Sequence, residues 1–131
     1  MELENLYNIA QNDNIGVYAF DLKECESLSL LDSGNCFIAI DPHKIESRAD
    51  EKVKLAHELG HCVTGAFYNA YSPFDIRSKH EHSADKWAIL QLIPEKELKR
   101  ACKLCRNRWE LSIHFGVTED FMQKALDFYK Q

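Results

Sequence analysis

One short stretch of the sequence decides the fold: His57-Glu58-Leu59-Gly60-His61. Helix residues four apart lie one turn above each other on the same face, so both imidazoles can reach one small cation. Zinc favours imidazole nitrogen, and a catalytic zinc takes three protein ligands and a water. Glu58 is then placed to accept the proton of that water. The alternative is a chance match, two ordinary helix histidines around a solvated glutamate, unless a third ligand follows downstream.

The third ligand is expected at Glu81, 20 residues after the second histidine. Glu81 and Asp85 are one helical turn apart on a stripe whose other residues are apolar: Ala84, Ala88, Ile89 and Leu92. Carboxylates on such a stripe are costly to bury unless they are paired or bind a metal. We therefore expect His57, His61 and Glu81 to hold zinc. Asp85 would accept a hydrogen bond from the other ring N–H of one ligating histidine. The alternative is that both acids lie there only because the helix dipole favours negative charge at a helix N-terminus.

The periodicity around the motif predicts two helices. The first begins at Ser47, a plausible N-cap, and runs to about residue 67. Gly60 lacks a Cβ, which would let another element approach the histidines closely, and Cys62 is turned away from His61 into the core. A polar and aromatic connection over residues 68–79 follows, and the second helix covers residues 80–92.

The N-terminal part predicts a helix and a small sheet. Residues 2–12 carry one apolar helical stripe, and residues 15–20 and 36–40 are β-branched and aromatic enough for strands. Between them, a short strand is expected near residues 28–31 and a turn at 32–35.

The last third predicts helices only. One helix covers residues 95–106, and residues 109–115 and 119–129 form a helical hairpin with Thr118 as N-cap. The expected fold class is therefore α+β, a mainly helical domain with a small N-terminal sheet and a C-terminal helical hairpin. It is a single domain over residues 1–131, with the sheet at about 15–40, the zinc helices at about 47–92 and the C-terminal helices at about 95–130.

Composition and charge are those of a globular protein. The chain is 45% apolar and 28% charged, with no apolar run near the roughly 20 residues of a membrane span. Residues 1–98 contain 9 basic and 17 acidic side chains, for a net charge of −8. Residues 99–131 contain 7 basic and 4 acidic side chains, for a net charge of +3. The positive excess is expected to be a solvated helix face; an acidic partner or nucleic acid is the alternative.

The N-terminus is acidic and has no signal-peptide pattern, so we expect a cytoplasmic protein without a membrane partner. Its five cysteines are an odd number, and in a reducing compartment no disulfide framework is expected. Cys102 and Cys105 form a lone C-x-x-C without a second pair, which favours packing and a surface thiol over a metal site.

The two motifs resemble a known family. The H-E-x-x-H followed by Glu81-His82-Ser83-Ala84-Asp85 is similar to the gluzincin arrangement of thermolysin-like peptidases. The continuation from Ala84 to Pro94 resembles the ImmA/IrrE family, which carries H-E-x-G-H and then E-x-x-A-[ND]-x-[FW]-A before a Leu/Ile/Met-Pro. The resemblance implies a zinc metallopeptidase that cleaves a helix-turn-helix repressor of a phage or mobile element. It also implies a zincin-like fold, with His57, His61 and Glu81 as ligands and Glu58 as general base.

The oxyanion of the reaction needs a donor besides the metal. Thermolysin-like enzymes use a tyrosine and a histidine, and neither can be placed here by spacing. Tyr68 and Tyr71 in the connection are candidates, with simple packing or surface exposure as the alternative. Manganese is less suited than zinc to two imidazoles and one carboxylate.

Two other functions compete with the peptidase. The hairpin from Leu111 to Thr118 and the helix after it resemble a DNA-binding helix-turn-helix. However, Glu119 and Asp120 at the start of its second helix would face phosphates, so direct nucleic-acid binding is not expected. The remaining alternative is a catalytically silent protein that binds the repressor without cutting it.

Overall fold

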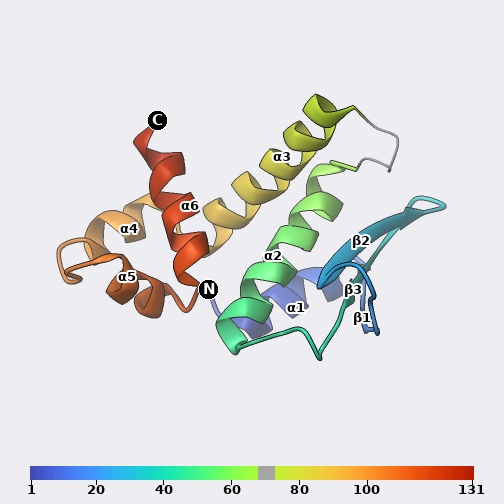
Figure 1. The fold of residues 1–131 in the computed structure, drawn as a ribbon, viewed down its shortest axis with the longest axis horizontal. Coiled ribbons are helices and arrows are strands. Elements are labelled where there is room, and N and C mark those ends of the chain that lie inside the picture. The colour runs from blue at the N-terminus through green and yellow to red at the C-terminus, as the bar shows by residue number, and fades with distance from the viewer. Residues whose placement is uncertain (68–72) are drawn as a thin grey trace.

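The computed structural model describes residues 1–67 and 73–131, which form six helices and one three-stranded sheet. The elements in chain order are α1 (Leu3–Asn12), β1 (Gly16–Ala19), β2 (Ser27–Asp32), β3 (Asn35–Ile40), α2 (Arg48–Thr64), α3 (Phe74–Leu92), α4 (Glu95–Ala101), α5 (Arg108–Phe115) and α6 (Glu119–Lys130). Figure 1 shows α2 at the centre with α3 beside it, the sheet on one side and α4, α5 and α6 on the other. The expected α+β class, mainly helical, is confirmed.

The sheet has the strand order β1-β3-β2, with β1 parallel and β2 antiparallel to β3. Ser33 and Gly34 connect β2 to β3 with φ angles of 52° and 82°, as a two-residue hairpin with left-handed turn residues requires. The predicted strands and the turn at 32–35 are therefore confirmed. Because β2 is one of the two terminal strands, only one of its edges is paired within the described residues.

One cluster of buried side chains includes residues of every helix. Its largest fully buried members come from the sheet, from four helices and from the residue that caps α3: Leu6, Ile38, Leu55, Leu59, Leu92, Ile93 and Met122. Burying each such side chain contributes about 1.5–3 kcal/mol. Within the part of the chain that the structure describes, no helix combines the length and apolar character needed to cross a bilayer.

The start of α2 is as predicted, and its end is not. The Ser47 hydroxyl accepts a hydrogen bond from the Asp50 N–H at 3.1 Å, which confirms the N-cap. The helix was expected to reach about residue 67, but it stops at Thr64. Gly65 adopts a left-handed conformation with φ of 69° and closes the helix there.

Two further boundaries predicted from the sequence were wrong. Helix α3 begins at Phe74 rather than at residue 80, because Pro73 precedes a helix as readily as it lies in a connection. Residues 68–72 of that predicted connection lie outside the described residues. Helix α4 ends at Ala101 rather than at residue 106, because α5 has its own start close by. The Asn107 side chain accepts from the Glu110 N–H, and the Glu110 carboxylate accepts from the Arg106 N–H.

No disulfide framework was expected, and the structure has one disulfide that the sequence did not predict. Cys36 in β3 and Cys62 in α2 form a disulfide, with their Cα atoms 5.8 Å apart. Their separation of 26 residues in the sequence does not reveal that β3 and α2 pack together. Cys25, Cys102 and Cys105 are free, and Cys105 packs against the core while Cys102 is exposed, as expected for that pair.

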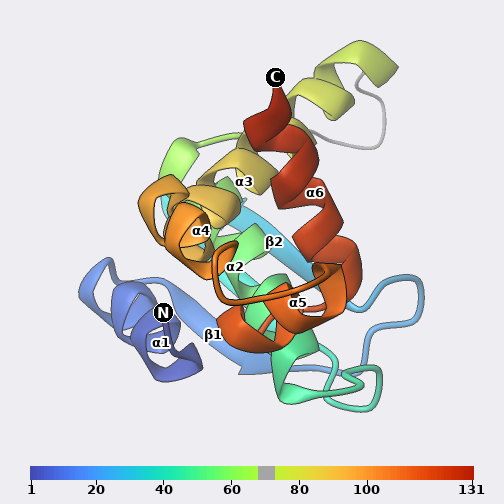
Figure 2. The same cartoon turned by 90° about the vertical axis from the view of Figure 1, so that its left-hand side faces the viewer.

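The C-terminal hairpin packs on the side of α2 and α3 that faces away from the sheet (Figure 2). The Thr118 hydroxyl accepts from the Phe121 N–H and begins α6, as predicted. The buried ammonium of Lys52 in α2 donates to the Phe115 carbonyl at the end of α5, at 2.7 Å. This contact satisfies a buried charge and a helix-end carbonyl together, and it ties the hairpin to α2.

Candidate metal centre

Three side chains from α2 and α3 converge at one point. The Nε2 atoms of His57 and His61 are 3.2 Å apart. The Glu81 carboxylate lies 2.9 Å from His57 Nε2 through one oxygen and 3.0 Å from His61 Nε2 through the other. One ligand atom of each residue lies within 4.8 Å of the others. The structure thus brings together all three residues that the sequence predicted.

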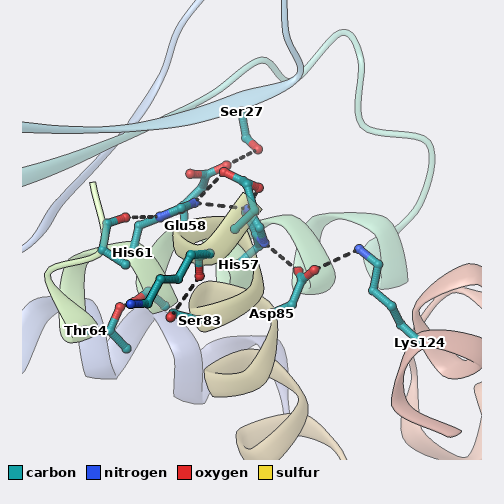
Figure 3. Close-up of polar contacts among 12 residues, drawn as sticks. Ser27, His57, Glu58, His61, Thr64, Ser83, Asp85 and Lys124 are labelled. Carbon is teal, nitrogen blue, oxygen red and sulfur yellow. Dashed lines mark hydrogen bonds and ion pairs between the residues drawn. The ribbon is translucent and has the colours of Figure 1, made fainter. Parts of the chain in front are cut away.

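The outer ring nitrogens of both histidines have acceptors. His57 Nδ1 is 2.8 Å from Asp85 Oδ1, and His61 Nδ1 is 2.5 Å from the Ala66 carbonyl oxygen (Figure 3). A carboxylate and a carbonyl only accept, so each Nδ1 carries the hydrogen and each Nε2 of a neutral ring offers its lone pair inward. The left-handed turn at Gly65 precedes Ala66, whose carbonyl meets His61 from the same helix end.

This donor set fits a small divalent cation. Ligand atoms about 2.0–2.1 Å from a tetrahedral zinc are separated from one another by roughly 3.4 Å. The two Nε2 atoms are 3.2 Å apart, and each lies 2.9 or 3.0 Å from a different oxygen of Glu81, distances close to that separation. His61 is buried and Glu81 is 40% exposed, so the cluster opens to solvent on the side of Glu81.

The charges of the cluster are coupled. Burial lowers the pKa of His57, but its hydrogen bonds to Asp85 and Glu81 outweigh burial and raise that pKa to about 10. Burial is likewise outweighed at His61, whose pKa is raised by Glu81 and the Ala66 carbonyl. A cation must displace the protons of both rings, so its affinity for this site falls as the pH is lowered.

Glu58 lies beside the cluster and is not part of it. It is only 6% exposed, and its Oε2 accepts a hydrogen bond from the Ser27 hydroxyl of β2 at 2.8 Å (Figure 3). The role of Ser27 was not predicted, because its position depends on how β2 packs over α2. No signal near Ser27 in the sequence could have revealed this contact.

A cleft of about 510 Å³ lies over these residues. Residues 25–29, at the start of β2, line one wall, and His57, Glu58, His61, Phe67 and Glu81 line the rest with Lys54. A smaller hollow of about 280 Å³ shares His57 and Glu81 and extends towards Phe121 and Lys124 of α6. Tyr68 and Tyr71, the predicted oxyanion donors, lie outside the described residues.

Gly60 permits the close packing of the two motif helices. A Cβ at this position would lie 2.6 Å from the Ala84 carbonyl oxygen and 2.9 Å from the Ala84 Cα of α3. The prediction that a bare Cα lets another element approach the histidines is confirmed. The approaching element is the helix that carries Glu81 and Asp85.

Two basic side chains of the C-terminal hairpin, Arg108 and Lys124, have partners within the chain. Arg108 contacts the Glu119 carboxylate at 2.8 Å and the Gln123 side chain at 2.7 Å. The Lys124 ammonium donates to Asp85 Oδ2 at 3.1 Å, a contact that sequence analysis also missed. These contacts compete with phosphate binding by α6.

Comparison with known proteins gives one match. Residues 11–127 match the model of peptidase family M78, described as the IrrE N-terminal-like domain. No curated protein and no solved structure matches the chain significantly.

Proposed function

The chain belongs to peptidase family M78, and from this membership we propose that it is a zinc-dependent endopeptidase whose substrate is a helix-turn-helix transcriptional repressor. The observation that carries the proposal is the convergence of His57, His61 and Glu81 in one cleft with Glu58 beside them. The repressor rests on the resemblance of the motifs to the ImmA/IrrE family, and it implies a cytoplasmic protein. The Cys36–Cys62 disulfide is then an exception to the usual reduced state of thiols in that compartment.

Each residue of the site has a role in this proposal. His57, His61 and Glu81 hold the zinc ion, which when bound activates a water and polarises the scissile carbonyl. Glu58 takes the proton of the attacking water and returns it to the leaving amine. Asp85 and the Ala66 carbonyl orient the two imidazoles, and Ser27 holds the Glu58 carboxylate.

The position of β2 beside the cleft favours cleavage inside a substrate polypeptide rather than at one of its ends. An extended peptide can add to the unpaired edge of a terminal strand through main-chain hydrogen bonds. The start of β2 lines the cleft directly above Glu58, so a peptide bound there passes over the proposed metal centre. This mode of binding needs no free peptide terminus, which supports an endopeptidase.

The metal content of the protein tests this proposal first. We expect wild type, purified without added metal, to carry about one zinc per chain, because three protein ligands converge. Glu81→Ala removes one ligand and should lose most of the zinc, whereas Glu97→Ala, an exposed glutamate of α4, should retain it. Elemental analysis gives the result. A wild-type chain that is metal-free and takes up no added zinc would contradict the peptidase proposal.

Cleavage of a purified helix-turn-helix repressor tests the substrate. The zinc-loaded wild type should cut it, with the new termini identified by mass spectrometry. A wild type that binds the repressor tightly and leaves it intact would support the catalytically silent alternative instead.

Removing the hydroxyl of Ser27 should slow the reaction without affecting zinc. A hydrogen bond to a charged group is worth about 1.5–3 kcal/mol, so Ser27→Ala is expected to lower kcat about tenfold. Ser27→Thr keeps the hydroxyl and should retain most of the activity. Ser29→Ala, on the same face of β2, is the control. Equal kcat values for Ser27→Ala and Ser29→Ala would contradict the assigned role.

A further inference from the structure

Helix α6 reaches the metal centre through one side chain. The Lys124 ammonium donates to Asp85 Oδ2 at 3.1 Å, and the other oxygen of the same carboxylate lies 2.8 Å from His57 Nδ1. Lys124 and Asp85 are 39 residues apart in the sequence. Figure 3 shows the three side chains in a line, with Asp85 between the imidazole and the ammonium.

The two contacts constrain Asp85 from opposite sides. A carboxylate held through one oxygen can still turn about its own bond to the chain, because that terminal torsion is soft. A second partner on the other oxygen fixes the carboxylate plane and therefore the direction of the acceptor that His57 meets. The Asp85 and His57 side chains are each 21% exposed, so water competes weakly for these contacts.

No other lysine or arginine in the described residues contacts Asp85. Lys54, which lines the same hollow, is engaged by Asp50 at 2.6 Å and by Glu26 at 2.7 Å. Lys130, the other lysine of α6, has no ion pair among the described residues, which makes it a matched comparison. The Lys124 side chain is 58% exposed, so dissolved salt weakens its electrostatic attraction to Asp85.

We propose that Lys124 is a positioning residue of the metal centre, holding Asp85 so that the carboxylate orients His57 towards the cation. The inference rests on the proposed function, because it concerns the same site. It extends that site from the two motif helices to the C-terminal hairpin. The hairpin then covers the core and also sets the geometry of a ligand.

The sign of the effect on zinc affinity separates positioning from simple electrostatics. Lys124 repels a cation through space, so if it acted only by its charge, Lys124→Met would tighten zinc binding. If it positions Asp85, the same substitution weakens zinc binding. Methionine keeps most of the aliphatic stem, so packing of α6 changes little.

The test is a double-mutant cycle on the zinc dissociation constant, measured by competition with a chromophoric chelator. Asp85→Asn is expected to weaken binding about 10- to 100-fold, as removal of such outer contacts does. Lys124→Met should weaken it about 3- to 10-fold, because it acts one step further away and is half exposed. In the Asp85→Asn background Lys124→Met should have no further weakening effect. Lys124→Arg should restore affinity, and Lys130→Met is the control.

Each outcome decides the question. Unchanged or tighter zinc binding in Lys124→Met overturns the inference, as does an equal loss in the Asp85→Asn background. A loss of the same size in Lys130→Met would assign the effect to the general charge of α6 and overturn it too. In all these cases wild type still binds zinc, so the proposed function stands. A wild type that binds no zinc removes the proposed function, and this inference with it.

Discussion

Replacing Glu58 by glutamine is expected to lower kcat/KM for peptide hydrolysis by about 10²- to 10⁴-fold, the usual contribution of a positioned general base. Glutamine has nearly the same shape and can still accept the hydrogen bond from Ser27, but it cannot take a proton from water. Glu58 lies outside the cluster of His57, His61 and Glu81, so the zinc content should stay at the wild-type value.

Activity and zinc content of the same preparations provide the measurement. Glu51→Gln is a suitable control, since Glu51 lies on the same helix and accepts a hydrogen bond from the Tyr7 hydroxyl away from the cleft. It should retain full activity. A Glu58→Gln variant that cuts at the wild-type rate, or that loses its zinc, would contradict the role of general base.

Gly60→Ala is expected to destabilise the protein and to weaken the metal centre together. Alanine improves helix propensity by about 1 kcal/mol, but overpacking in a core typically costs about 1–3 kcal/mol. The obstacle here is the backbone of Ala84, which cannot rotate away as a side chain can. The propensity gain offsets part of this cost, so we expect a net loss of up to about 2 kcal/mol in the free energy of unfolding. Since Glu81 and Asp85 move with α3, zinc binding should weaken about 10- to 100-fold.

Denaturant unfolding of the metal-free protein measures the free energy of unfolding, and competition with a chelator measures the zinc affinity. Val63→Ala is the control, because it also raises helix propensity in α2 but lies at an exposed position. Its stability should equal or slightly exceed that of wild type. If Gly60→Ala behaves like Val63→Ala in both measurements, the close contact between α2 and α3 does not limit the site.

The parts of the site that local geometry determines could be predicted from the sequence. The four-residue spacings of His57 with His61 and of Glu81 with Asp85 correspond to one helical turn. Each pair therefore lies on one helix face, whichever tertiary structure surrounds it. The Ser47 and Thr118 caps were predictable for the same reason, since each depends on the N–H of a residue three positions on.

The contacts that were missed all depend on tertiary packing. Ser27 meets Glu58, Lys124 meets Asp85 and Cys36 meets Cys62 across 26 to 39 residues of sequence, from elements of different types or distant helices. The misplaced helix ends have another cause. Gly65 and Pro73 are compatible with either a helix end or a loop, and only the packing of α2 against α3 selects between them.

Helix α2 is held near both of its ends by contacts that need no metal ion. Near its start, the Lys52 ammonium is bound to the Phe115 carbonyl, and near its end Cys62 is joined covalently to Cys36. Rotation of the helix about its own axis would break both. The direction of the two imidazoles is therefore fixed by the folded chain before any ion arrives. A cation can exchange at such a centre without refolding of the helix that holds it.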